Sequence, residues 1–232
     1  MKRRLSRSAA LAPVTALVVL AGCTAGPAGG TTAGTMPVHR VGGDTVVVAP
    51  VHSSTTAYAG LREFVGAAPI VVTGRVVAAD DTAYEVLPDP DAEGVLPGEG
   101  PDLYGSITFA VTATVKGRVR QKQVEVVYES GKRESADRRI AYTHEGLSPF
   151  QTATGELRSA AALTGREFLI FAAPNTVLPV PAGAYVLAHP LGVAAVAKGG
   201  AVTFPGPGSQ PFGSAGTTVS AVTLAQVRSA VR

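Results

Sequence analysis

An acidic segment from residue 80 to 102 carries the residue types that could bind a divalent cation. It holds eight Asp and Glu residues and no Lys or Arg. The run DPDAEG, from residue 89, begins like a calcium loop, with acidic residues at its first, third and fifth positions and glycine at its sixth. The twelfth position should be a bidentate Glu but is Gly100, and nearby prolines oppose the flanking helices. The sequence therefore predicts a solvated acidic loop. If the loop instead binds a cofactor, that cofactor is a divalent cation, and its candidate ligands are Asp89, Asp91, Glu93 and Glu99.

The residues for hydrolytic chemistry are incomplete. His144-Glu145 begins like a zinc-protease motif, but Ser148 stands where that motif needs a second histidine. Ser214 lies in FGSAG, which lacks the first glycine of a nucleophile elbow. The sequence therefore indicates no catalytic residue and favours a protein that is not an enzyme. A metal-dependent hydrolase that uses His144, Glu145 and the acidic loop stays an alternative.

A basic run follows the acidic segment, between residues 116 and 139, although four acids dilute it. Such a run either contacts anionic lipid headgroups or wall polymers, or is simply the charged ends of strands and hairpins. Without interleaved aromatic residues, it does not predict a nucleic-acid surface. The candidate residues for an anionic surface are Arg118, Arg120, Lys122, Lys132 and Arg133.

Cys23 is the only cysteine of the chain. It follows a basic N-terminus, an apolar stretch over residues 9–19 that is too short for a permanent membrane span, and the sequence Leu20-Ala21-Gly22. This pattern resembles the lipobox of bacterial lipoproteins. The resemblance implies cleavage between Gly22 and Cys23, attachment of a diacylglycerol to the Cys23 thiol, fatty acylation (palmitate) of the new amino group, and an extracytoplasmic protein anchored to the cell membrane through lipid. An acylated Cys23 leaves no thiol for disulfides, metal binding or catalysis.

Signal cleavage changes the charge of the working protein. The whole chain has 20 Lys and Arg against 17 Asp and Glu, and four of the bases lie within residues 1–22. The mature chain is therefore close to neutral, and its basic whole-chain isoelectric point does not indicate a nucleic-acid partner.

Three segments follow from composition and periodicity. Residues 1–22 are the signal peptide, residues 23–43 are a Gly, Ala, Thr and Pro-rich tether, and residues 44–232 are a β-rich domain. Alternating apolar residues and turn signals predict its strands. The expected strands are 44–51, 69–78, 106–115, 123–129, 166–172, 183–188, 192–197 and 201–204. A short helix is expected within 55–66, and Thr223 and Gln226 predict a capping box that opens a C-terminal helix.

Short strands, an interior glycine at position 74 and helices at the ends favour a small, curved, mainly antiparallel OB-like barrel. The segments IVVTGRVV, SITFAVTATVKG, VEVVYES, LTGREFLIFAA and AYVLAHPLGVAAVAKGGAV resemble a pattern in uncharacterised secreted proteins of Gram-positive bacteria. Those proteins are similar in outline to the barrel of netrin and metalloproteinase-inhibitor (TIMP) modules. The zinc-chelating N-terminal cysteine of the inhibitors does not carry over, because Cys23 is far from the barrel and predicted to be acylated.

Together these features predict a membrane-anchored lipoprotein that acts as a binding or structural module of the cell envelope. Its expected partners are membrane lipid, through Cys23, and an envelope protein or polymer, but not nucleic acid. Besides the hydrolase, one other alternative to this role stays open. It is an inhibitor-like module that contacts a protein partner through barrel-rim loops at 140–160.

Overall fold

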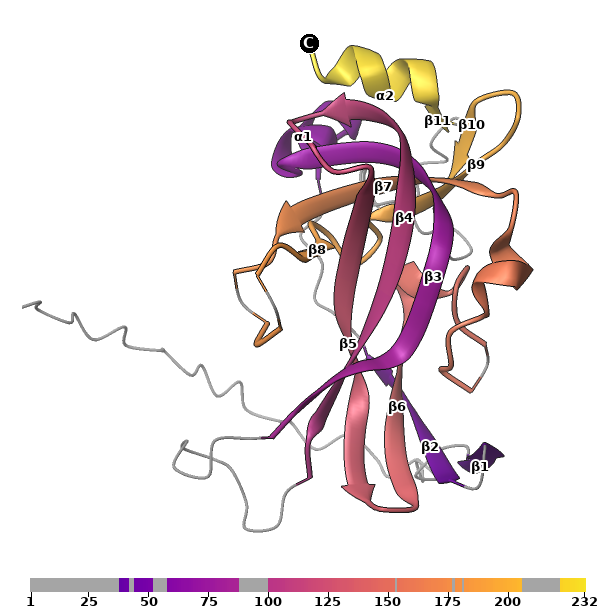
Figure 1. Ribbon diagram of the computed structural model, residues 1–232. Helices are drawn as coiled ribbons and strands as arrows, with labels where there is room; N and C mark the ends of the chain where they lie inside the picture. Colours follow the sequence, from indigo (N-terminus) through magenta and orange to yellow (C-terminus); the bar gives the residue numbers. More distant parts are fainter. Residues whose placement is uncertain are drawn as a thin grey trace, which may run out of the picture. The chain divides into compact units, whose positions relative to one another are not determined.

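A computed structural model describes residues 38–41, 44–51, 58–87, 100–152, 154–176, 178–180, 182–205 and 222–232, all within one compact unit that begins at Met36 (Figure 1). In chain order its elements are β1 (Val38–Val41), β2 (Asp44–Val51), α1 (Leu61–Ala67), β3 (Ile70–Val86), β4 (Asp102–Lys116), β5 (Gln123–Ser135), β6 (Arg138–His144), the 3-10 helices η1 (Glu145–Leu147) and η2 (Ala160–Leu163), β7 (Glu167–Pro174), β8 (Tyr185–Leu187), β9 (Val193–Val196), β10 (Ala201–Thr203), β11 (Val222–Thr223) and α2 (Leu224–Ala230). Among the described residues, no helix has the length and apolar character needed to cross a membrane.

Five strands close a barrel. β4 pairs antiparallel with β3 and β5, and β3 pairs antiparallel with β7. The short strand β8 completes the ring, because it pairs antiparallel with β7 and, through Val126 and Tyr185, parallel with β5. A five-stranded ring with these connections fits the Greek-key barrel of OB-like folds. The predicted mainly β barrel with two helices is confirmed.

Strands on both sides extend the barrel. β6 pairs with β5, β2 pairs parallel with β6, and β1 pairs with β2. On the other side β9, β10 and β11 follow β7. β1 lies within the range predicted as a tether, and β6 was not predicted. β3 and β5 also run beyond their predicted ends, to Val86 and Ser135, because their outer parts leave the barrel and pair with β4 and β6.

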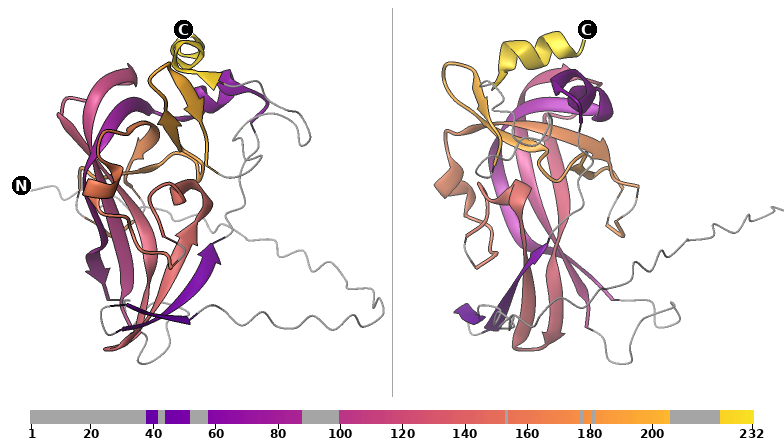
Figure 2. Two further views of the ribbon diagram at one scale, coloured as in Figure 1. Left: turned by 90° about the vertical axis from the view of Figure 1, so that its right-hand side faces the viewer. Right: turned by 180° about the vertical axis from the view of Figure 1, so that it is seen from behind.

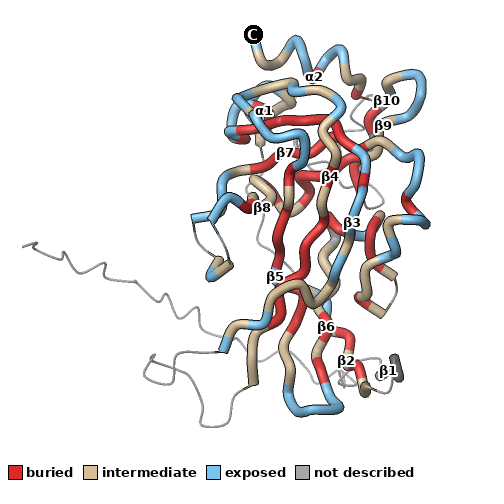
Figure 3. The backbone as a smooth tube through the Cα atoms, viewed as in Figure 1, coloured by how far each residue is buried: buried red, intermediate tan, exposed pale blue. Residues whose placement is uncertain are grey.

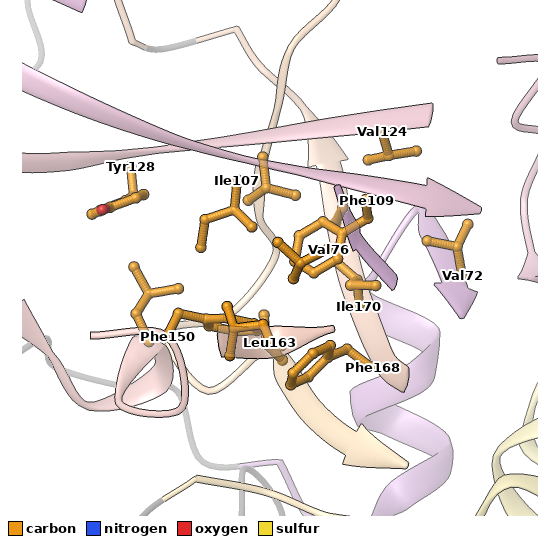
Figure 4. Close-up of a cluster of buried hydrophobic side chains, with 14 of the residues drawn as sticks. Val72, Val76, Ile107, Phe109, Val124, Tyr128, Phe150, Leu163, Phe168 and Ile170 are labelled. Atoms are coloured by element: carbon orange, nitrogen blue, oxygen red, sulfur yellow. The ribbon is translucent and has the colours of Figure 1, made fainter. Parts of the chain in front are cut away.

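The barrel strand β7 is apolar on both faces and separates two hydrophobic clusters. Phe168 and Ile170 point into the barrel core, where they meet Phe109 and Phe150 (Figure 4). The alternate residues Leu169 and Phe171 point to a second cluster, which α1, α2, β9, β10 and β11 cover. All five residues from Phe168 to Ala172, in the middle of β7, are accordingly buried (Figure 3). The prediction that this strand is central is confirmed.

Two local signals in the sequence are also confirmed. The register between β3 and β4 shifts at Gly74, where an added Cβ would lie 2.9 Å from the Ala110 carbonyl oxygen. Only glycine allows so close a backbone approach, and the bulge helps the strand to bend. At α2, the Gln226 amide donates to the Thr223 hydroxyl and the Thr223 amide donates to the Gln226 side chain, which forms the predicted capping box.

The ends of the barrel differ in what closes them (Figures 1 and 2). We call one the helix end: it consists of α1, α2, the turn between β9 and β10, and residues 116–122 between β4 and β5. We call the other the hairpin end: it consists of the start of β2, the outer parts of β3 and β4 (residues 80–86 and 102–104), and the hairpin of β5 and β6 over residues 129–139.

Candidate functional site

Two of the predicted sites lie outside the described residues. These are the lipidation site, Gly22 and Cys23, and the candidate cation ligands Asp89, Asp91, Glu93 and Glu99. Among the residues that are described, no group of three His, Cys, Asp or Glu side chains has the geometry of a metal site.

His144 stands at the junction of β6 and η1, where its ring connects two strands. Its Nε2 lies 2.5 Å from the Glu129 carbonyl oxygen, and its ring meets the Tyr128 ring edge to face. Burial lowers the pKa of His144, partly offset by the bond to the Glu129 carbonyl. These contacts hold β6 against β5.

Rim loops were predicted over residues 140–160, but residues 140–144 belong to the strand β6; the part after them begins with η1 and is tied to β6 by Gln151. The buried Gln151 side chain accepts from the His144 amide at 3.0 Å and donates to the Tyr142 carbonyl at 2.9 Å. It also donates to the Gly155 carbonyl, which folds residues 151–157 onto β6. A fixed loop of this kind covers the barrel rather than presenting an extended rim.

Arg139 is the charged residue buried most deeply in the hairpin end. Its guanidinium lies 3.3 Å from the Asp81 carboxylate and 3.6 Å from the Glu156 carboxylate, so it links β6 to β3 and to the segment after η1. Nearby, the Ser130 hydroxyl donates to the Asp81 carbonyl. The guanidinium retains only a tenth of its exposure, whereas both carboxylates remain about a quarter exposed. The network therefore closes this end of the sheet with paired charges.

Tyr128 places a hydroxyl beside this network. Its ring lies over Gly105, its partner in register on β4, where an added Cβ would approach the ring to 2.5 Å. The ring belongs to the barrel core (Figure 4), yet its buried hydroxyl has no hydrogen-bond partner among the described residues. Burial raises the pKa of Tyr128, and the carboxylates of Asp81 and Asp80 raise it further. The hydroxyl stays protonated and is available as a donor.

The hairpin end also gathers acids outside the barrel. Glu129 is the register partner of Tyr104, and burial, together with Asp102, raises the pKa of Glu129. Burial and these same two carboxylates raise the pKa of Tyr104 and of Tyr142. Burial is the larger cause of each shift, and the carboxylates of Asp102 and Glu129 add to it, so these groups lie in a partly buried and locally acidic environment.

The five residues predicted to contact an anionic surface do not form one patch. Arg118, Arg120 and Lys122 lie at the helix end, before β5 begins. Lys132 and Arg133 lie near the other end of β5, and Arg133 pairs with Glu85 at 2.9 Å. Ten residues of extended chain, or about 33 Å, separate Lys122 from Lys132.

At the helix end the cations stand on elements that are connected to one another. Val119 packs against the barrel core, which leaves Arg118 and Arg120 exposed on either side of it. The Lys116 amine donates to the carbonyls of Val65, Gly66 and Ala68 at 2.7–2.8 Å and so ties the end of β4 to α1. This end is the part of the described chain that is best suited to hold an anionic ligand.

Comparison with protein-family models, curated proteins and solved structures finds no match to the chain.

Sequence reasoning missed the Arg139 network and the Tyr128 hydroxyl. Arg139 lay in a run of charges that resembled a solvated hairpin, and its partner Asp81 is 58 residues away. Arg138 and Arg139 are adjacent, so in a strand their side chains point to opposite faces of the sheet. This alternation was the available signal that one of them could be buried.

Proposed function

We propose that the protein is a lipid-anchored extracytoplasmic lipoprotein whose OB-like barrel acts as a binding or structural module of the bacterial cell envelope. The observation that carries the proposal is Cys23, the only cysteine, placed directly after Leu20-Ala21-Gly22 and a basic, then apolar, N-terminus. The compact unit begins at Met36, which leaves a link of twelve residues between Cys23 and the domain.

The barrel supports a binding role more than a purely anchoring one. Barrels of this class bind extended polymers on their surfaces and loops. The described part of this barrel carries exposed, unpaired cations at one end and paired charges at the other. An anchored domain with such a surface is suited to hold a charged component of the envelope close to the membrane.

Metabolic labelling tests the anchor. The full chain is produced in a Gram-positive host that is fed an alkyne-tagged palmitate, and membranes are then extracted with detergent. We expect the label on the wild-type protein and on Thr24→Ala, and no label on Cys23→Ala, which should accumulate as an uncleaved precursor. The matched Thr24→Ala variant separates loss of the thiol from a general effect on processing. Unchanged label and membrane partitioning of Cys23→Ala would overturn the proposal.

A further inference from the structure

We propose that the helix end binds a linear phosphodiester polymer of the cell envelope; this inference rests on the proposed function, which puts the domain outside the membrane. The surface is formed by exposed cations of α1, α2, the loop between β4 and β5, and the turn between β9 and β10. These residues are Arg62, Arg118, Arg120, Lys122, Lys198, Arg228 and Arg232.

The first argument is the imbalance of charge. The segments 61–68, 116–122, 197–200 and 224–232 contain eight Lys and Arg residues and one acid, Glu63. Glu63 already accepts a hydrogen bond from the Ala59 amide. Within the described chain, the ion pairs join Arg133, Arg138 and Arg139 to carboxylates of the other parts of the domain, and none involves the seven exposed cations. With eight cations against one carboxylate, and without ion pairs to the seven exposed cations in the described chain, this end carries a net positive field.

The second argument is the choice of side chain. Five of the seven exposed cations are arginines, whose planar guanidinium groups match the oxygen atoms of a phosphate with two parallel hydrogen bonds. Their positions on several connected elements suit a ligand that repeats its charge along a chain. The contact between the Leu224 amide and the Gly200 carbonyl, at 2.8 Å, joins α2 to the turn that carries Lys198. Elements fixed in this way lose little entropy when a ligand binds.

The third argument favours a polymer over a lipid surface. Proteins that lie on membranes insert large apolar side chains between the headgroups. The large apolar side chains exposed among the described residues are Val77 and Leu87, and both belong to the β3 region rather than to the helix end.

The path of the chain supports the same choice. Coming from Cys23, the chain enters the domain at Val38, which is level with Val47, Ile140 and Lys132 through successive strand pairs. This is the hairpin end, and the 15 residues of β4, about 50 Å of strand, lead from there to the helix end. The chain from Cys23 thus joins the domain at the end opposite the proposed surface, which suits a surface that faces away from the anchor.

Binding of the purified, detergent-solubilised full chain to an immobilised glycerol-phosphate polymer tests the inference. The variant Arg118→Gln/Arg120→Gln removes two cations at the helix end. Lys132→Gln/Arg138→Gln is its control, because it removes the same charge at the hairpin end. At about a factor of five per cation, we expect roughly 25-fold weaker binding for the first variant and less than a twofold change for the control. The wild-type affinity should also fall steeply with salt, and the slope should decrease in the first variant only.

Two outcomes would overturn the inference. Equal losses in both variants would mean that net charge, not the helix end, governs binding. In the second outcome, micelles doped with phosphatidylglycerol compete with the immobilised polymer for the protein. If they compete as strongly as free polymer does at equal phosphate concentration, the ligand is a lipid headgroup instead. The palmitate label is read on the same preparation: labelled protein that fails to bind polymer overturns this inference alone, and polymer binding by unlabelled protein overturns the anchor alone.

Discussion

The helix end and the hairpin end of the barrel use the same types of charged residue in opposite ways. At the hairpin end, Arg133, Arg138 and Arg139 each have a carboxylate partner, and one of these pairs is largely buried. At the helix end, Arg118 and Arg120 are exposed and have no acidic neighbour within the described chain. The described domain therefore separates its paired charges from its displayed charges between its two ends.

The difference follows from what each end must do to fold. At the hairpin end the Arg139 guanidinium and its carboxylates come together across three segments, and a small buried cluster of Val46, Val48 and Ala141 packs between β2 and β6. The helix end is closed by apolar packing of α1 and α2 over Phe171 and its neighbours. Its cations are thus not needed for closure. Charges of the first kind should affect stability, and charges of the second kind should affect binding.

The largest effect on stability is expected for Arg139→Met, which leaves the Asp81 and Glu156 carboxylates without their shared cation. Fully buried pairs lose about 3–5 kcal/mol when one partner is removed, and since both carboxylates are about a quarter exposed we expect a loss of about 2 kcal/mol. Urea unfolding followed by circular dichroism measures it.

The neighbouring Arg138→Met is the control for Arg139→Met. Arg138 pairs with Glu134 in the same hairpin, but its side chain is 55% exposed. We expect this variant to lose less than about 0.5 kcal/mol. Similar losses in the two variants would contradict the view that the hairpin end depends on one buried network.

The parts of this comparison that the sequence predicted are those that depend on local patterns. A run of residues that is apolar on both faces predicted β7, and the spacing of Val124, Val126 and Tyr128 predicted the face of β5 that points into the barrel. Thr223 and Gln226 predicted the start of α2. Each of these signals needs only residues within a few positions of one another.

The missed parts depend on contacts between distant segments. β6 has the sequence RRIAYTH, whose polar residues resemble a hairpin loop, and it becomes a strand because β5 and β2 pair with it on both sides. Arg139 meets Asp81 on β3 and Glu156 after η1, and Asp81 is 58 residues away from it in the sequence. No local pattern encodes contacts between segments so far apart.

A smaller loss is expected for Lys116→Gln at the helix end, where one cation does have a structural role. Its amine donates three hydrogen bonds to carbonyls in and just after the last turn of α1, and hydrogen bonds from a charged donor contribute about 1.5–3 kcal/mol when buried. Lys116 is partly exposed, so we expect a loss of about 1.5 kcal/mol in urea unfolding.

The same substitution at Lys122 is the matched control, since its side chain is exposed and lies in the same loop. Lys122→Gln should change stability by less than about 0.5 kcal/mol. A loss at Lys122 as large as that at Lys116 would break the distinction between cations that close the helix end and cations that are displayed on it.

The smallest change, and the only expected gain, is for Tyr128→Phe. The Tyr128 hydroxyl is the exception at the hairpin end, because it is buried beside the paired charges and has no hydrogen-bond partner within the described chain. Removing an unsatisfied hydroxyl while keeping the ring over Gly105 should stabilise the domain by about 1 kcal/mol, or roughly 2–4 °C in the melting temperature. Thermal unfolding followed by circular dichroism measures this shift, and Tyr142→Phe, whose side chain is only partly buried, should leave the melting temperature unchanged. A fall for Tyr128→Phe would instead mean that the hydroxyl is bonded in solution, to a water or a polar ligand held between Asp81 and the barrel core. The hairpin end would then also be a binding site, and the division between a structural end and a binding end would no longer hold.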